Sequence, residues 1–190
     1  MSSSKSIRTS ASHPLQINTL NVLNKPLIGL SFCPGKIDEG MFTGCLWQRD
    51  LEIDVAAVVK WGATIWLNLM EDEDLRAVKL DPELFANTVR SNNMTYIHFP
   101  IIDQGVPDAE GEVRWKNEIS PLLKQYLERG EKLFIHCRGG LGRTGIMAAK
   151  LLMDLGEAMP DESILLVRQA RSNTIETQVQ EDWVRNQLFE

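Results

Sequence analysis

The chain has 190 residues, of which 43% are hydrophobic and 24% are charged, and its formal net charge at pH 7 is −6. This length and composition predict one globular domain with a sizeable core. The acidic balance excludes a general affinity for nucleic acid or for anionic membranes, so we expect neither as a partner. It does not exclude a local basic pocket.

Cysteine and histidine residues are few and scattered. The three cysteines, Cys33, Cys45 and Cys137, form no even disulfide framework and no metal-ligand spacing, and the three histidines show no such spacing either. We therefore expect no metal site, and a reducing compartment in which the thiols stay free.

The N-terminal residues 1–16 are rich in serine and poor in apolar residues, a composition typical of a disordered arm. No hydrophobic run suits a signal peptide or a membrane span, so the cytoplasm is the expected location. A single domain should occupy residues 17–190.

Short apolar runs alternate with helix-like segments in the first hundred residues. Strands are predicted where such runs are bounded by turn residues, at 26–32, 64–70 and 95–100. Residues 46–49 should form a short connection. Helices are predicted at 50–61, which Gly62 should end, and from 81 to about 90, where Pro82 suits the first turn.

Four consecutive acidic residues, at 71–74, follow the second of these strands. One interpretation is a cation site. A solvated turn with its acids at the start of a helix is the better interpretation, because the helix dipole favours negative charge there.

The second half of the chain continues the alternation. An amphipathic helix is predicted at 112–129, with a kink or break at Pro121 and an end at Gly130. A strand at 133–135 and helices at 146–155, at 161–170 and from 174 to about 189 follow. This pattern is typical of an α/β fold with a central, mostly parallel sheet and helices on both faces.

The most informative segment is EKLFIHCRGGLGRTG, at residues 131–145. It joins a buried strand, a loop with three glycines and the start of a helix. Such a loop can point successive backbone amides into one concavity, and the helix N-terminus adds partial positive charge, so the segment predicts an anion-binding cradle. The Gly-Lys-Ser/Thr ending of an ATP-binding loop is missing.

A cysteine at the mouth of this cradle indicates nucleophilic chemistry. The loop amides, the helix end and Arg143 should all favour the Cys137 thiolate. Arg143 follows six residues later, and its planar fork can grip two phosphate oxygens. Thr144 can donate its hydroxyl to the thiolate or assist its departure, and His136 should order the cysteine backbone. The alternatives are an inert buried cysteine and a phosphate-binding module without catalysis.

These residues resemble the Cys-x5-Arg signature of protein tyrosine and dual-specificity phosphatases, matched by His136, Cys137, Arg143 and Thr144. Two further segments, IIDQGVPD at 101–108 and IETQVQ at 175–180, are similar to those of the cyclin-dependent-kinase-associated phosphatases, the cyclin-dependent kinase inhibitor 3 type. The resemblance implies the same α/β fold, a phosphocysteine intermediate, no cofactor and a phosphorylated protein as substrate. It also implies that the loop holds the substrate phosphate through Arg138, Gly139, Gly140, Leu141, Gly142 and Arg143.

The reaction also needs a general acid for the leaving oxygen and a base for the hydrolytic water. Asp103 and Asp108 precede Cys137 by 34 and 29 residues, and the resemblance favours Asp103, with Asp108 in reserve. The resemblance also implies that Gln180, placed by its spacing from Ile175, orients the water. Glu176 could steady Arg143 or an adjacent loop.

The sequence thus predicts hydrolysis of phosphotyrosine, and of phosphoserine or phosphothreonine, in proteins. The alternatives are a catalytically weak phosphate-binding scaffold and an enzyme acting on small phosphates such as inositol phosphates or RNA 5′-triphosphate ends. The loop contains no lysine, which makes the inositol-lipid alternative weaker. The sequence leaves open the physiological substrate, the oligomeric state and whether Cys33 or Cys45 pairs with oxidised Cys137.

Overall fold

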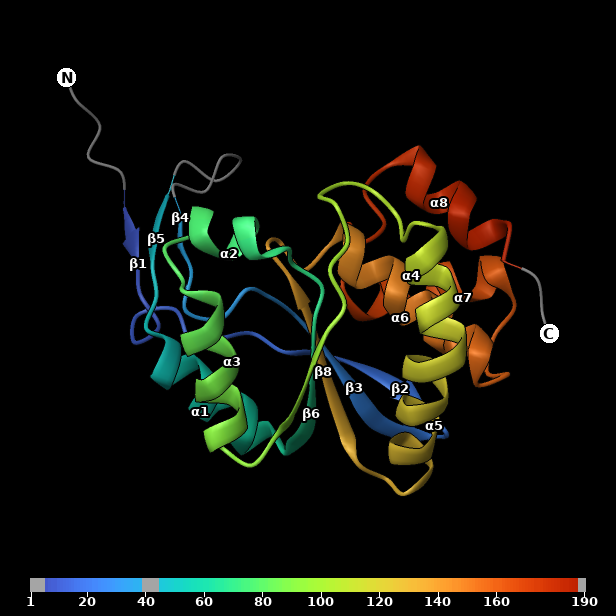
Figure 1. Cartoon of the computed structure of the whole chain (residues 1–190), viewed down its shortest axis with the longest axis horizontal. Helices are drawn as coiled ribbons and strands as arrows, with labels where there is room; N and C mark the ends of the chain where they lie inside the picture. Colours follow the sequence, from blue (N-terminus) through green and yellow to red (C-terminus); the bar gives the residue numbers. More distant parts are fainter. Residues whose placement is uncertain (1–5, 39–44, 188–190) are drawn as a thin grey trace.

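The computed structural model describes residues 6–38 and 45–187, and a five-stranded sheet forms its centre (Figure 1). In spatial order the strands are β2 (Asn18–Val22), β3 (Lys25–Phe32), β8 (Lys132–Cys137), β6 (Ala63–Asn68) and β7 (Thr95–His98). β2 pairs antiparallel with β3, and the other neighbouring strands are parallel. The predicted α/β fold with a mostly parallel sheet is confirmed.

Helices cover both faces of this sheet, as predicted (Figure 1). On one side lie α1 (Leu51–Trp61), α2 (Asp72–Ala77) and α3 (Pro82–Ser91). On the other lie α4 (Ala109–Arg114), the π-helical turn η1 (Trp115–Ile119), α5 (Ser120–Glu128), α6 (Gly142–Asp154), α7 (Pro160–Ala170) and α8 (Gln178–Arg185). Among the described residues, no helix has the length and apolarity that a bilayer crossing requires.

β8 lies in the middle of the sheet, and its residues Leu133, Phe134 and Ile135 are fully buried. Because helices cover both faces, this strand carries apolar side chains on both, which explains its continuous hydrophobic run. Trp66 on β6 packs against the rings of Phe134 and Phe85. The core therefore fixes the strand that ends in Cys137.

Several helix ends differ from the sequence prediction for local reasons. The helix expected from residue 112 begins at Ala109, because Asp108 caps it by accepting a hydrogen bond from the Gly111 amide. The π-helical turn immediately precedes α5, in which Pro121 lies in the first turn and cannot donate a backbone hydrogen bond. The last helix begins at Gln178, four residues later than predicted, because Thr177 forms a capping box. It ends at Arg185, before the predicted end at about residue 189, which lies outside the described residues.

The N-terminal residues 1–16 are expected to form a disordered arm, but the structure describes residues 6–16, which include a short strand. β1 (Ile7–Arg8) pairs with β5 (Leu46–Gln48), which in turn pairs with β4 (Ile37–Asp38) in a second, small sheet. The side chain of Ser10 is buried and accepts a hydrogen bond from the Asp50 amide at 2.9 Å. Backbone pairing and a hydrogen bond with one hydroxyl require few apolar residues. The amino-acid composition of this segment therefore did not indicate them. Residues 1–5 lie outside the described residues.

Candidate active site

The glycine loop lies between the carboxyl end of β8 and the amino end of α6, the edge at which α/β sheets bind ligands. Cys137 is the last residue of the strand and is 3% exposed. The backbone amide of Gly140 donates to its sulfur at 3.2 Å. One loop amide thus already faces the position at which a thiolate would form.

Gly140 is required by the way the loop packs. Its φ is +69°, and a β-carbon there would lie 2.2 Å from the carbonyl oxygen of Ser31, at the end of β3. A side chain would therefore force the loop away from the sheet. Gly139 has open space around it, so the same argument does not apply there.

Arg143 is buried beneath the loop, with its side chain 1% exposed. Its Nη1 donates to the carbonyl of Ile101 at 3.0 Å and to Asp74 Oδ2 at 2.5 Å. Asp103 Oδ1 lies 2.8 Å from Nη2, yet Nε and Nη2 have no hydrogen-bond partner among the described residues. The Nε–Nη2 edge, which could bind two oxygens, thus makes no aligned hydrogen bond here, and the Asp103 carboxylate lies beside it. Burial works against the charge, but Cys137 and Asp74 raise the pKa of the guanidinium above its usual value.

Asp74 is a site residue that the sequence interpretation missed. The acidic run at 71–74 does open a helix, α2, but its last carboxylate lies on Arg143 and is only 18% exposed. The reason is the strand order: β6 neighbours β8, so the segment after β6 reaches the same sheet edge as the glycine loop. The signal in the sequence was an acidic run directly after a buried strand.

The two candidate acids have different surroundings within the acid loop, which we define as residues 101–108. Asp103 contacts Arg143 and its side chain is 55% exposed, whereas Asp108 caps α4 through the Gly111 amide at 2.7 Å. Of these two aspartates, only Asp103 thus contacts the arginine of the glycine loop. Two hydrogen bonds tie the acid loop to the start of α8, from Thr177 to the Gln104 carbonyl and from Gln180 to the Gly105 carbonyl.

Gln180 and Glu176 are both brought to the glycine loop. The Gln180 side chain is fully buried, accepts from the Glu176 amide at 2.9 Å and donates to the Gly105 carbonyl at 3.1 Å. Glu176 Oε2 accepts from the Gly142 amide at 2.8 Å, so it steadies the loop and not Arg143. The Gly142 amide is consequently committed to a carboxylate in this structure, contrary to its predicted role in phosphate binding.

Arg138 also has a partner in this structure: it forms two 3.0 Å hydrogen bonds with Asp38 and is one-third exposed at the side chain. Its guanidinium is therefore directed to β4, which differs from a direct phosphate contact.

His136 and Thr144 are fully buried, and neither His136 ring nitrogen nor the Thr144 hydroxyl has a hydrogen-bond partner among the described residues. Burial lowers the pKa of His136 to about 3, so the ring is neutral at pH 7. The ring packs against Trp66 and Phe85, and the His136 carbonyl accepts from the Leu69 amide at 3.1 Å. This packing fixes the strand directly before the cysteine.

The described part of the chain contains no group of three or more His, Cys, Asp or Glu side chains able to hold a metal ion. All three cysteines are free thiols and are buried. The site thus brings together a thiol, an amide-lined loop, an arginine fork and a carboxylate.

Comparisons with known proteins point to one family. The family model PTP-SAK, described as a Swiss Army Knife protein, DSP-PTPase phosphatase domain, matches residues 41–184. A protein of Invertebrate iridescent virus 3 named "Putative tyrosine phosphatase 067L" is 29% identical over 153 residues, which cover 78% of this chain and 58% of that protein. Human cyclin-dependent kinase inhibitor 3 is 39% identical over 82 residues, 42% of this chain and 37% of that protein.

A solved structure is similar over most of the chain. The crystal structure of kinase associated phosphatase with a serine at its catalytic-site cysteine has a TM-score of 0.76 and 25% identity, and the match covers 90% of this chain and 92% of that one. The chain spans 58% of the length of the viral relative and 37% of the length of the human one.

Proposed function

The chain belongs to the DSP-PTPase phosphatase family, and we propose that it is a protein phosphatase that hydrolyses phosphotyrosine, and phosphoserine or phosphothreonine, through a phosphocysteine at Cys137. The observation that carries the proposal is the juxtaposition of the Cys137 sulfur with a loop amide, together with an Arg143 edge, Nε–Nη2, that makes no hydrogen bond among the described residues. We propose one catalytic domain over residues 17–190, with no cofactor.

In the first step the Cys137 thiolate attacks phosphorus in line, and the phosphorus–oxygen bond to the leaving group breaks as the sulfur–phosphorus bond forms. The Nε–Nη2 edge of Arg143 and the loop amides bind the equatorial oxygens, whose charge is spread in the transition state. Asp103, next to Arg143, gives its proton to the leaving oxygen. The hydroxyl of Thr144 favours the thiolate as a leaving group in the second step.

In the second step, water attacks phosphorus and gives a proton to Asp103, while the sulfur–phosphorus bond breaks to release inorganic phosphate and the Cys137 thiolate. Gln180 is the group proposed to place this water. Support comes from its position: a β-carbon on Gly142 would lie 2.7 Å from its side-chain nitrogen, so the amide adjoins the glycine loop. The same amide reaches the acid loop through Gly105.

We also propose that the substrate is a phosphorylated protein and that the enzyme works in the cytoplasm. The first part is supported by the names of similar proteins, a viral protein named as a tyrosine phosphatase and the kinase associated phosphatase. The second rests on the three free thiols, because a catalytic cysteine has to stay reduced.

Stopped-flow hydrolysis of p-nitrophenyl phosphate in the presence of EDTA tests the proposed chemistry. We expect a burst of p-nitrophenolate stoichiometric with the enzyme, because fast phosphoryl transfer to Cys137 precedes a slower hydrolysis of the phosphocysteine. EDTA should leave the burst unchanged. Absence of any turnover, with inorganic phosphate still protecting Cys137 from iodoacetate, would make the chain a phosphate-binding module.

Asp74→Ala should lower kcat/KM for p-nitrophenyl phosphate about tenfold, because one charge-assisted hydrogen bond that fixes the buried Arg143 is lost. Steady-state kinetics and binding of orthovanadate measure the effect. Asp72→Ala is the matched control, since Asp72 lies on the same helix, is 46% exposed and pairs with Arg76. Its kcat/KM should stay within about twofold of wild type. Tighter vanadate binding at an unchanged rate in Asp74→Ala would contradict the positioning role.

A further inference from the structure

Three successive carbonyl groups on the outer side of the glycine loop are each bound by a cationic side chain. Lys36 Nζ donates to the Arg138 carbonyl at 3.2 Å. Arg171 donates to the next two, from Nη2 to the Gly139 carbonyl at 3.1 Å and from Nε to the Gly140 carbonyl at 2.7 Å. The two cations come from opposite parts of the chain, the turn between β3 and β4 and the end of α7.

A peptide group is planar and trans, so a carbonyl held outward turns the following amide inward. The peptide between Gly139 and Gly140 shows the consequence. Its oxygen accepts from Arg171, and its N–H donates to the Cys137 sulfur at 3.2 Å. Arg171 and the thiol therefore lie at opposite ends of one peptide dipole, and a cation at the oxygen end strengthens the N–H as a donor.

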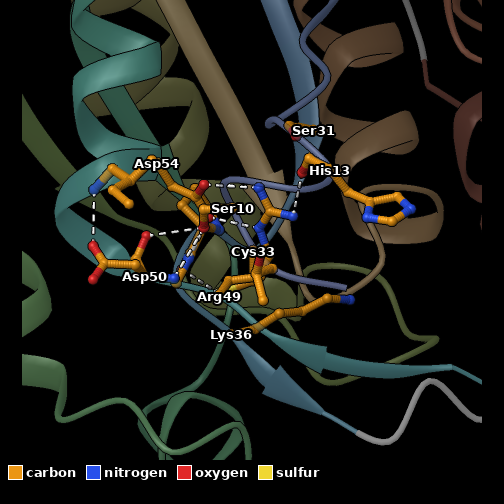
Figure 2. Close-up of polar contacts among 12 residues, drawn as sticks. Ser10, His13, Ser31, Cys33, Lys36, Arg49, Asp50 and Asp54 are labelled. Atoms are coloured by element: carbon orange, nitrogen blue, oxygen red, sulfur yellow. Dashed lines mark hydrogen bonds and ion pairs between the residues drawn. The ribbon is translucent and has the colours of Figure 1, made fainter. Parts of the chain in front are cut away.

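Lys36 is held in place by a buried ion pair (Figure 2). Arg49 and Asp54 form two hydrogen bonds of 2.7 and 2.8 Å, with side chains at most 1% exposed. Asp54 also accepts from the Gly35 amide at 2.8 Å, and the Arg49 amide donates to the Lys36 carbonyl at 3.2 Å. Gly35 has φ +73°, and a β-carbon there would meet Leu51 at 2.8 Å. These contacts thus hold the turn so that Lys36 reaches the outer side of the glycine loop.

Arg171 is committed in the same way. Its remaining terminal nitrogen, Nη1, donates to Asn18 on β2 at 2.7 Å. Burial of both cations is costly: Lys36 is only 7% exposed, and burial lowers the pKa of both Lys36 and Arg171, while Cys137 raises them. Lys36 and Arg171 thus add two positive charges around the loop that carries Cys137.

We propose that Lys36 and Arg171 form a carbonyl clamp on the outer side of the glycine loop, which holds the loop amides toward the bound anion and favours the Cys137 thiolate. They act as positioning residues, since their nitrogens contact loop carbonyls. The proposal deepens the proposed function and rests on Cys137 as its nucleophile.

Other charged or titratable groups also surround the thiol and must be kept constant in a test. Arg143 approaches from α6, and Arg138, paired with Asp38, follows the cysteine directly. His136 is neutral at pH 7, and burial raises the pKa of the Cys33 thiol far above its usual range, so Cys33 carries no charge. Lys36 and Arg171 are therefore two cations beyond the catalytic arginine that can be removed one at a time.

The test is the pKa of the Cys137 thiol, measured from the pH dependence of its alkylation by iodoacetate in Lys36→Met, Arg171→Met and Arg171→Lys. Each methionine variant should raise this pKa by about 1, and the Kd of inorganic phosphate, measured as protection from iodoacetate, should rise about tenfold. Arg171→Lys keeps the charge but loses the fork that spans two carbonyls, so its values should be intermediate.

Lys132→Met is the matched control. Lys132 is at the opposite end of β8 from Cys137, donates to the Trp61 carbonyl at 3.1 Å and lies over the Trp61 ring, just as Lys36 lies over Phe32. In the Lys132→Met variant, the pKa of the Cys137 thiol and the Kd of inorganic phosphate should equal those of wild type. Unchanged values in folded methionine variants would overturn the clamp. If those variants do not fold, wild-type values in Arg171→Lys would overturn it. Both readouts need no turnover, so they remain valid if the proposed phosphatase activity fails.

Discussion

Replacing Cys137 by serine should reduce hydrolysis of p-nitrophenyl phosphate by more than about 10⁴-fold, because the residue is proposed to be the nucleophile itself. A serine hydroxyl stays protonated in conditions where a thiol in this loop would ionise. The Gly140 amide and the Arg143 fork are untouched, so affinity for inorganic phosphate should persist. Burst kinetics and isothermal titration calorimetry with phosphate measure the two halves of the prediction.

Cys45→Ser is the matched control for this experiment. Cys45 is also a buried free cysteine, but it directly precedes β5 in the small sheet and accepts a hydrogen bond from Ser6. Its rate should stay near that of wild type. Turnover by Cys137→Ser comparable to wild type would place the nucleophile elsewhere. Loss of both turnover and phosphate binding would mean that the thiol helps to hold the loop itself.

The sequence predicted the catalytic loop because its information is local. A continuous apolar run identified β8, since a strand covered on both faces has apolar side chains on both. The glycines, Cys137 and Arg143 lie within one short segment, so their spacing along the chain is enough to bring them together. The predicted roles of Asp103 and Gln180 depended on a family resemblance, and the structure places both of them, and Glu176, beside that segment.

The roles of residues that reach the site through the strand order could not be predicted from the sequence. Lys36 and Arg171 are single cations in a turn and at a helix end, and Asp74 is the last of four consecutive acids, so the local sequence does not say which group each of them contacts. They reach the loop because β3 and β6 flank β8 and because α7 ends over β2. Within the predicted arm, Ile7 and Arg8 pair with β5 through the backbone, and composition does not encode such pairing.

The two aspartates of the acid loop offer a matched pair for testing the general acid. Asp103→Asn should lower kcat about 10²- to 10⁴-fold for alkyl phosphates and phosphoserine peptides, because their leaving oxygens need a proton as the bond breaks. With p-nitrophenyl phosphate the loss should be much smaller, since p-nitrophenolate leaves without one. The ratio of kcat for the aryl and alkyl substrates is the quantity to compare between variants.

Asp108→Asn tests the reserve candidate with the same change of charge. Asp108 caps α4 through the Gly111 amide, and asparagine is also a good cap, so both stability and the aryl-to-alkyl ratio should stay near wild type. Asp108→Ala should cost about 1 kcal/mol of unfolding free energy, again with an unchanged ratio. Equal losses on aryl and alkyl substrates in Asp103→Asn would show that this carboxylate only orients Arg143. A leaving-group dependence in Asp108→Asn instead would require the acid loop to move so that Asp108, not Asp103, reaches the substrate.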